Sequence, residues 1–314
     1  MKKIFYLFSI IFPLFFYSCA KDDDIYLFSY FINNGEDGLH LAYSHDGLNW
    51  VALNNGNSYL QPTVGKDKLM RDPSICKGGD GRYHLVFTSS WTDRIIGYTS
   101  SKDLINWETQ KSIPVMMKEP DAKNCWAPEL FFDKKQSLYY IFWATTIPGK
   151  HSPIEDSETE KGLNHRIYYV TTKDFNDFSD TKLFFNPDFS VIDASIIYDK
   201  DKYIMFLKNE NPNPAQKNIR ITSTNSLKEG FPIDVSNPIT GKYWAEGPSP
   251  LKIGDSIYVY FDKYMEHKYG AVRSEDLINW EDVSDKISFP KGTRHGTAFK
   301  VKKEVFNKLI EKEK

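Results

Sequence analysis

Short runs of aromatic and β-branched residues alternate with polar turns along almost the whole chain, and one polar phrase recurs within this pattern. The phrase ends in an aromatic residue and occurs clearly at residues 44–50, 101–107 and 274–280. Weaker copies stand at 172–178 and 223–231, so the last aromatic residues of neighbouring copies are 49 to 71 residues apart. A repeat near 50 residues is typical of the blades of a β-propeller, each built from four short strands.

Each copy of the phrase follows two predicted strands. The strands that lead directly into the phrase are expected at 38–44, 95–100, 166–171, 218–223 and 269–274. The strands before these are expected at 25–32, 83–88, 138–143, 202–207 and 256–261. A third type of segment comes first in the unit and lies at 72–75, 127–130, 193–196, 246–249 and 295–298. No helical pattern of useful length precedes the charged tail at 302–314.

The two ends of the chain complement each other. The N-terminal part supplies the second and third strands of a blade without a first, and the segment at 295–298 supplies a first strand without successors. Together they complete a fifth blade, and closure of the ring removes the unpaired edges of an open sheet. The sequence therefore predicts an all-β fold, a single five-bladed β-propeller over residues 25–314 whose N-terminal strands complete the last blade.

Unusual residues gather at the starts of the first strands, namely Asp72, Glu129, Asp193, Glu246 and His295. First strands line the axis of a propeller, so their starts are expected to meet at one mouth. Carboxylates that recur at one position of the repeat and meet there raise one another's pKa, which proton-transfer chemistry uses. Taken singly, Asp-Pro or Glu-Gly-Pro would indicate only a turn. Glu129 has the alternative role of hydrogen bonding to neighbouring backbone.

Composition narrows the classes of partner. Hydrophobic residues make up 40% and charged residues 26%, which is enough apolar material for a packed core. The 40 Lys and Arg residues nearly balance the 42 Asp and Glu residues, so no basic excess is present to bind nucleic acid. Aromatic residues reach 15%, which suits strands and carbohydrate-binding surfaces. We expect a monomer.

The first residues have the features of an export signal. Lys2 and Lys3 precede an apolar run at 4–17 that is short for a bilayer, so 1–18 are predicted to be a signal peptide. Cys19 follows, as in the lipobox of bacterial lipoproteins, and 19–24 would form an acidic tether after the lipidated cysteine. The expected location is the outer membrane, at the cell surface or on the periplasmic face. The alternative is ordinary secretion with an incidental cysteine.

Two carboxylates that face each other across a sugar are the minimum apparatus for glycoside hydrolysis. One carboxylic acid protonates the leaving oxygen, and the other, ionised, removes a proton from water. Trp91, Trp126 and Trp244 are expected at the mouth, where indole rings stack on sugar faces. The tryptophans of the repeated phrase are expected at the other end, in the core.

Motifs in order along nearly the whole mature chain resemble those of glycoside hydrolase family 43. Residues 71–75 resemble its general-base motif, and 126–129 resemble its Trp-Ala-Pro-acid motif, with Glu129 where aspartate is commoner. Residues 191–195 match the third acid, 244–248 match the general acid, and 294–296 resemble the axial histidine.

The resemblance implies an inverting glycosidase in which Asp72 is the general base and Glu246 the general acid. Asp193 would keep Glu246 protonated and orient it. Sugar contacts are expected from Trp91, Trp126, Glu129, Arg220, Trp244 and Arg294, although pairing with the buried acids is an equal role for the two arginines. The chemistry would need no cofactor, and His295 would mark a structural calcium or a water cluster. The substrate would be a plant-type polysaccharide or oligosaccharide.

Alternatives remain at this level. Arabinofuranosides and xylosides are the expected substrates, with galactans as another class within the family. The long polar insertion at 145–165 is expected to narrow the mouth toward an exo-acting pocket. A retaining fructan hydrolase of related five-bladed families and a lipid-anchored propeller that only binds glycans are the two rival interpretations.

Overall fold

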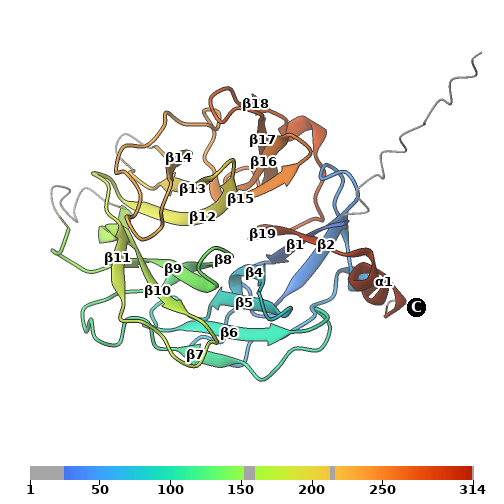
Figure 1. Ribbon diagram of the computed structural model, residues 1–314, viewed down its shortest axis with the longest axis horizontal. Coiled ribbons are helices and arrows are strands. Elements are labelled where there is room, and N and C mark those ends of the chain that lie inside the picture. Colours follow the sequence, from blue (N-terminus) through green and yellow to red (C-terminus); the bar gives the residue numbers. More distant parts are fainter. Residues whose placement is uncertain (1–24, 152–159, 213–215, 313–314) are drawn as a thin grey trace, which may run out of the picture.

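The computed structural model describes residues 25–151, 160–212 and 216–312. Within these residues, five antiparallel sheets stand around a common axis, as Figure 1 shows. The prediction of an all-β, five-bladed propeller is confirmed. The predicted signal peptide, Cys19 and the acidic tether lie outside the described residues, as does the central part of the insertion at 145–165.

The sheets are numbered here as blades in the order of their innermost strands. Blade 1 consists of β4 (Arg71–Lys77), β5 (Tyr83–Thr88), β6 (Ile96–Ser101) and β7 (Lys111–Ile113). Blade 2 consists of β8 (Trp126–Asp133), β9 (Leu138–Thr146), β10 (His165–Thr172) and β11 (Lys182–Phe185). Blade 3 consists of β12 (Val191–Asp199), β13 (Lys202–Asn209) and β14 (Asn218–Thr224). Blade 4 consists of β15 (Glu246–Ile253), β16 (Ser256–Lys263), β17 (Lys268–Ser274) and β18 (Glu281–Asp282).

Blade 5 closes the ring and joins the two ends of the described chain. It consists of β19 (Arg294–Val301), β1 (Ile25–Phe31), β2 (His40–Ser44) and β3 (Val51–Ala52). Antiparallel pairing of β1 with β19 places Ile25 opposite Val301 and Ser29 opposite Thr297. The prediction that N-terminal strands complete the last blade is therefore confirmed.

The predicted second and third strands agree with the structure to within three residues at either end. The expectation of four strands per blade is wrong for blade 3, where the described residues form only three. Residues 225–245 run past β14 and pair with it at single points, as where the amide of Ser236 donates to the carbonyl of Ile221. Pro232 and Pro238 in this segment have no amide hydrogen to donate to a ladder.

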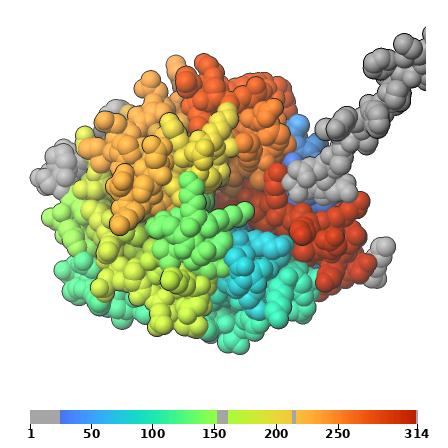
Figure 2. Space-filling view, in the orientation of Figure 1, coloured from blue at the N-terminus to red at the C-terminus, as the bar shows by residue number. Residues whose placement is uncertain are grey.

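The core consists of wedges between blades. Five clusters of buried side chains each join two neighbouring blades. The inner strands contact one another in the cyclic order β4, β8, β12, β15 and β19. In the space-filling view the blades follow one another around the centre in sequence order (Figure 2). Burial between blades thus fixes where each inner strand lies.

The repeated phrase forms a turn at the outer side of the blades. In its first copy, the Asp46 side chain accepts hydrogen bonds from the amides of Leu48 and Asn49 and from the side chain of Ser44. The aromatic residue that ends the phrase packs inward, and the Trp50 ring stacks on that of Phe289 with 5.4 Å between centroids. The prediction that these tryptophans are packing residues is confirmed for Trp50, which is 4% exposed.

Three short 3-10 helices and one α-helix complete the described chain. They are η1 (Asn54–Gly56), η3 (Glu160–Gly162), η4 (Ser284–Lys286) and α1 (Lys303–Glu311). Leu309 of α1 is fully buried against the wedge between blades 5 and 1. No helix in the described ranges has the length and apolar character that a membrane crossing requires.

Candidate active site

Each of the first four inner strands is interrupted near its start by a bulge of two residues. The bulges follow Arg71, Trp126, Ile192 and Glu246, where the pairing with the second strand shifts register. The first bulge residue has a positive φ in every case, and these residues are Asp72 (51°), Ala127 (45°), Asp193 (54°) and Gly247 (62°). Bulges re-aim side chains at the rim of a sheet, so each bulge directs groups toward the axis.

The bulges correct the interpretation that the acids share one position of the repeat. Asp72 and Asp193 are first bulge residues, whereas Glu246 directly precedes its bulge and Glu129 directly follows one. Side chains on a strand alternate between faces, and a bulge changes that alternation locally. Asp72 and Asp193 therefore share one position, whereas Glu246 and Glu129 each hold a different one.

A small cavity, called here the axial pocket, lies where these strand starts meet. Its volume is about 170 Å³. Asp72, Asp193 and Glu246, from blades 1, 3 and 4, all line it together with His295 of blade 5. The structure thus brings together the three acids that the sequence separates by up to 174 positions.

Asp72 is held as a carboxylate. Thr88 donates a hydrogen bond to its Oδ2 at 2.7 Å, and Nδ1 of His295 lies 3.4 Å from its Oδ1. Burial acts to raise the pKa of Asp72, but the hydrogen bond and charge of His295, with Arg71 and Thr88, lower the pKa to about 2. Asp72 can therefore accept a proton from water over the whole physiological pH range.

His295 is the counter-ion of the acids. Burial acts to lower its pKa, but the charges of Asp193 and Asp72 outweigh burial and raise the pKa to about 9. The ring packs directly on the backbone of Gly247, where an added Cβ would lie 2.4 Å from the His295 Cγ. Glycine after Glu246 is thus required by space as well as by its φ of 62°.

Asp193 and Glu246 line the same pocket, and their pKa values are shifted in opposite directions. Burial, with Glu246 and Asp72 nearby, raises the pKa of Asp193 to about 6. Burial also acts to raise the pKa of Glu246, but Lys208 at 3.1 Å and Arg294 at 3.4 Å outweigh it and lower this pKa below its ordinary value. On acidification the first proton that the pair takes up therefore goes to Asp193.

This proton position differs from the expectation that Asp193 keeps Glu246 protonated. The reason is Lys208, a lysine that is only 3% exposed and that contacts Glu246 and, at 2.6 Å, Glu210. Neither Lys208 nor Glu210 is among the site residues predicted from the sequence. A lysine within the otherwise buried run of β13 was the available signal, because lysine is rarely buried unless it is paired.

Aromatic side chains form one wall of the axial pocket. Trp91 and Trp126 both line it, with ring centroids 5.4 Å apart and ring planes at 85°. The indole N–H of Trp126 donates to the Trp91 carbonyl at 2.9 Å, and the Arg71 guanidinium lies over the Trp91 ring. Trp91 remains 41% exposed, so the part of its indole ring that Arg71 does not cover is open at the rim.

The other residues predicted to contact sugar from the rim, Trp244, Arg294 and Arg220, do not line the axial pocket. Trp244 is half-buried and does not line the pocket, and its ring contacts that of Tyr264. Arg294 pairs with Asp262 at 2.6 Å and with Glu246, which was its alternative role. Arg220 lies on β14, away from the pocket lining, and binds Asn218 and the carbonyl of Ser236.

Glu129 lies below the pocket and not in its wall. Ser74 donates to its Oε2 at 2.6 Å and Thr297 donates to its Oε1 at 3.3 Å, and the side chain is 5% exposed. Burial raises its pKa to about 7. Glu129 is thus a hydrogen-bonded residue of the interior that ties three inner strands together, and its partners are side-chain hydroxyls rather than the backbone groups expected for its alternative role.

The residues around His295 do not fit a calcium ion. Calcium takes oxygen ligands, whereas His295 offers only ring nitrogens, of which Nδ1 already lies 3.4 Å from Oδ1 of Asp72. Across the described residues, no group of three or more His, Cys, Asp or Glu side chains is arranged to hold a metal ion. Calcium therefore plays no part in the chemistry derived below.

The family described as a probable glycosyl hydrolase domain, related to glycoside hydrolase family 43, matches residues 23–306 of the chain. The chain belongs to this family. The match spans all five blades and every strand start that supplies an acid to the axial pocket. Within a family of glycosyl hydrolases, a pocket with three carboxylates and an aromatic wall is the place to look for the reaction.

Individual relatives are more distant. The chain is similar to an α-L-arabinofuranosidase of Bifidobacterium longum, 23% identical over 204 residues, which are 58% of this chain and 19% of that protein. It therefore spans about a fifth of the length of this relative. Among solved structures, an α-L-arabinofuranosidase from Lactobacillus brevis superposes with a TM-score of 0.52 at 16% identity, covering 68% of this chain and 72% of the other.

A family 43 β-1,3-galactosidase in complex with galactodeoxynojirimycin superposes with a TM-score of 0.53 at 12% identity. The match covers 71% of this chain and 79% of that one. These solved structures share the five-bladed fold with the family member described here. Their names differ in the sugar that is cleaved, so the fold alone does not select a substrate.

Proposed function

We propose that the protein is an inverting glycosidase that removes a terminal α-L-arabinofuranosyl residue from a plant-type polysaccharide or oligosaccharide. The observation that carries the proposal is that Asp72, Asp193 and Glu246 line one pocket. The pocket volume of about 170 Å³ is below the roughly 300–1,000 Å³ of sites for drug-sized ligands. Such a volume suits one sugar residue and supports action at a chain end. The name of the Bifidobacterium longum relative supports the choice of sugar.

The proposed reaction is a single displacement. Asp72 removes a proton from a water molecule whose oxygen attacks the anomeric carbon. The bond from that carbon to the glycosidic oxygen breaks, and Glu246 gives its proton to the departing oxygen. Because the pKa of Asp193 is raised to about 6, the Asp193–Glu246 pair holds a proton in weakly acidic solution. The reaction uses this proton when it lies on Glu246.

The walls of the pocket account for sugar binding in this proposal. The open indole surface of Trp91 offers a platform for the C–H face of a sugar, and Trp126 fixes its orientation. Asp193 is held by the amide of Gly247, which donates to its Oδ2 at 3.0 Å. This bond keeps the carboxylate next to Glu246, where it can exchange the proton and contact a hydroxyl group. The chemistry needs no cofactor.

A panel of aryl glycosides tests the proposal. We expect aryl α-L-arabinofuranoside to be cleaved faster than aryl β-D-xyloside and aryl β-D-galactoside, with no release by the Asp72→Asn protein prepared in parallel. Faster cleavage of the xyloside or the galactoside would refute the choice of sugar and leave the hydrolytic apparatus in place. If matched oligosaccharides bind without any release of product, the protein is a glycan-binding propeller and the proposal is wrong.

Replacement of Lys208 by methionine should change the pH dependence of kcat/KM. Lys208 lowers the pKa of Glu246 and of Asp193, so its loss raises both values. Activity that depends on a protonated acid then persists to higher pH. In the plot of kcat/KM against pH, the fall on the alkaline side, near pH 6 in the wild type, should move up by about one pH unit. Lys118→Met, at a lysine that is 87% exposed and pairs with Asp180, should leave this fall in place. An unchanged position of the fall in Lys208→Met would show that Lys208 does not act on the acid.

We propose that Cys19 is lipidated and anchors the protein in the outer membrane, at the cell surface or on the periplasmic face. The basis is the sequence alone, in which a short apolar run ends at this cysteine before three aspartates. In cells, Cys19→Ser should abolish incorporation of radiolabelled palmitate and move the protein to the soluble fraction. Cys125→Ser, at a buried free thiol, is the matched control and should stay in the membrane fraction. Unchanged labelling of Cys19→Ser would refute the anchor.

A further inference from the structure

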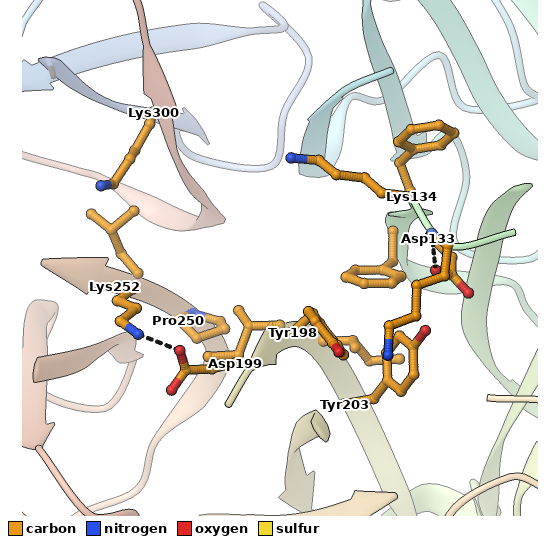
Figure 3. A pocket seen from close by; sticks show the side chains of 14 residues that line it. Asp133, Lys134, Tyr198, Asp199, Tyr203, Pro250, Lys252 and Lys300 are labelled. Atoms are coloured by element: carbon orange, nitrogen blue, oxygen red, sulfur yellow. Dashed lines mark hydrogen bonds and ion pairs between the residues drawn. The ribbon is translucent and has the colours of Figure 1, made fainter. Parts of the chain in front are cut away.

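A second pocket, called here the rear pocket, lies at the opposite end of the inner strands from the axial pocket. Its lining comes from the last parts of β8, β12, β15 and β19 (Figure 3). On β12, Asp193 belongs to the axial pocket and Tyr198 to the rear pocket. Five strand residues span about 17 Å, and Glu129 is buried between the two ends. A ligand in the rear pocket therefore cannot reach the catalytic acids.

The size of the rear pocket is that of a ligand site. Its volume is about 440 Å³, within the roughly 300–1,000 Å³ that is typical of small-molecule pockets. The side chains of Tyr198, Tyr203, Phe131 and Pro250 contribute apolar surface to the lining. Aromatic and apolar side chains of this kind can pack against the C–H groups on one face of a flat ligand.

Tyr198 is an exposed aromatic residue whose ring is already fixed. Its side chain is 39% exposed, its hydroxyl donates to Asp201 at 2.8 Å, and its ring contacts that of Tyr203 at 4.9 Å between centroids. The ammonium of Lys135 lies 4.5 Å from the centre of the ring. An aromatic surface that needs no reordering can bind a sugar face at low entropic cost.

The charges around this surface are mostly positive. Four lysines line the rear pocket against two carboxylates, namely Lys134, Lys135, Lys252 and Lys300 against Asp133 and Asp199. Both carboxylates are engaged, since Asp199 pairs with Lys252 and Asp133 accepts from the backbone amide of Lys135 and the side chain of Gln136. Figure 3 shows Lys134, Lys252 and Lys300 around the open centre of the pocket, with Tyr198 and Tyr203 along another side. The lining thus carries an excess of two positive charges next to an aromatic surface.

We propose that the rear pocket binds an acidic saccharide, a sugar residue that bears a carboxylate such as a uronic acid. Its C–H face would lie on the part of the Tyr198 ring that Lys135 leaves open, and its carboxylate would pair with Lys134. A neutral sugar would leave the charge of Lys134 unused, and a small inorganic anion would leave the aromatic surface unused. The inference concerns binding at a site remote from the acids, so it stands or falls separately from the proposed hydrolysis.

Isothermal titration with trigalacturonate, with the neutral sugar xylotriose as comparison, tests the proposal. We expect the wild-type protein to bind trigalacturonate, and we expect Lys134→Ala and Tyr198→Ala each to raise its Kd by about tenfold or more, as loss of a charge-assisted contact does. Trp91→Ala is the matched aromatic control in the axial pocket, and Lys118→Ala is the matched lysine control. Both controls should bind trigalacturonate as the wild type does.

The folded state of each variant is checked by its thermal unfolding midpoint and by cleavage of the best aryl glycoside, which Lys134→Ala and Tyr198→Ala should leave unchanged. The proposal is overturned if the wild type does not bind trigalacturonate, or if both rear-pocket variants bind it with wild-type affinity. Loss of affinity in Trp91→Ala would place the ligand in the axial pocket and would also overturn it. Displacement of trigalacturonate from the wild type by equimolar sulfate, or equally tight binding of xylotriose, would refute the acidic-saccharide class.

Discussion

Replacement of Asp72 by asparagine is expected to lower kcat on the best glycoside by about 10²–10⁴-fold, the contribution of a positioned general base. The amide has nearly the same shape and can still accept the hydrogen bond from Thr88, but it cannot take a proton from water. The substrate still meets the same tryptophan wall, so KM should change much less than kcat. Steady-state kinetics on the wild-type and variant proteins measure both quantities.

The control for this substitution is Asp188→Asn, which makes the same chemical change at an exposed carboxylate that is not part of the pocket lining. It should have wild-type kinetics. Thermal unfolding of Asp72→Asn has to remain cooperative for the comparison to hold. A folded Asp72→Asn protein with wild-type kcat would remove the base from the proposed reaction.

Glu246→Gln should have an equally large effect that depends on the leaving group. A glutamine cannot protonate the glycosidic oxygen, so cleavage of an oligosaccharide should fall by about 10²–10⁴-fold. A dinitrophenyl glycoside leaves without help from an acid, so its cleavage should fall far less. The ratio of the two rates in the wild type, in Glu246→Gln and in Asp72→Asn separates the two roles, because loss of the base slows both substrates alike.

The isosteric change at Glu246 also removes a charge that Lys208 and Arg294 contact, so the folded state has to be verified for this variant. Glu266→Gln, at an exposed glutamate that pairs with Lys263, is the matched control. Equal losses on the oligosaccharide and on the dinitrophenyl glycoside would contradict an acid role for Glu246. In that case Glu246 would contribute to substrate binding and not to protonation of the leaving oxygen.

The ring of blades could be predicted from the sequence because each blade repeats the same polar phrase. Asp46, Asp103 and Asp276 each accept hydrogen bonds from the two amides that follow two and three residues later. This local hydrogen-bond pattern needs the same residue types each time, so the repeat can be recognised in the sequence. The unmatched strands at the two chain ends predicted closure for the same reason.

The outermost strands are not marked by a repeated sequence pattern. They are short in most blades, as in β18 with two residues, and in blade 3 the corresponding segment carries Pro232 and Pro238. Pairing at an outer edge contributes little burial, so few constraints act on these residues. Periodicity alone therefore predicts the inner three strands of a blade better than the fourth.

The sequence predicted which residues belong to the candidate site more completely than it predicted their position along the propeller axis or their protonation state. Bulges shift the alternation of side chains, so Glu129 moved into the interior and Glu246 stayed in the pocket, although both stand at the start of a first strand. Lys208 comes from a second strand, where the repeat contains no marker of function. Its effect on the Asp193–Glu246 pair is an interaction between blades and can be found only in three dimensions.

Proton NMR of the product as it forms tests the central claim most directly. With the wild-type protein and an α-L-arabinofuranoside, the account predicts that β-arabinofuranose appears first and that the α-anomer grows in only by mutarotation. Initial appearance of the α-anomer would contradict a single displacement by water between Asp72 and Glu246.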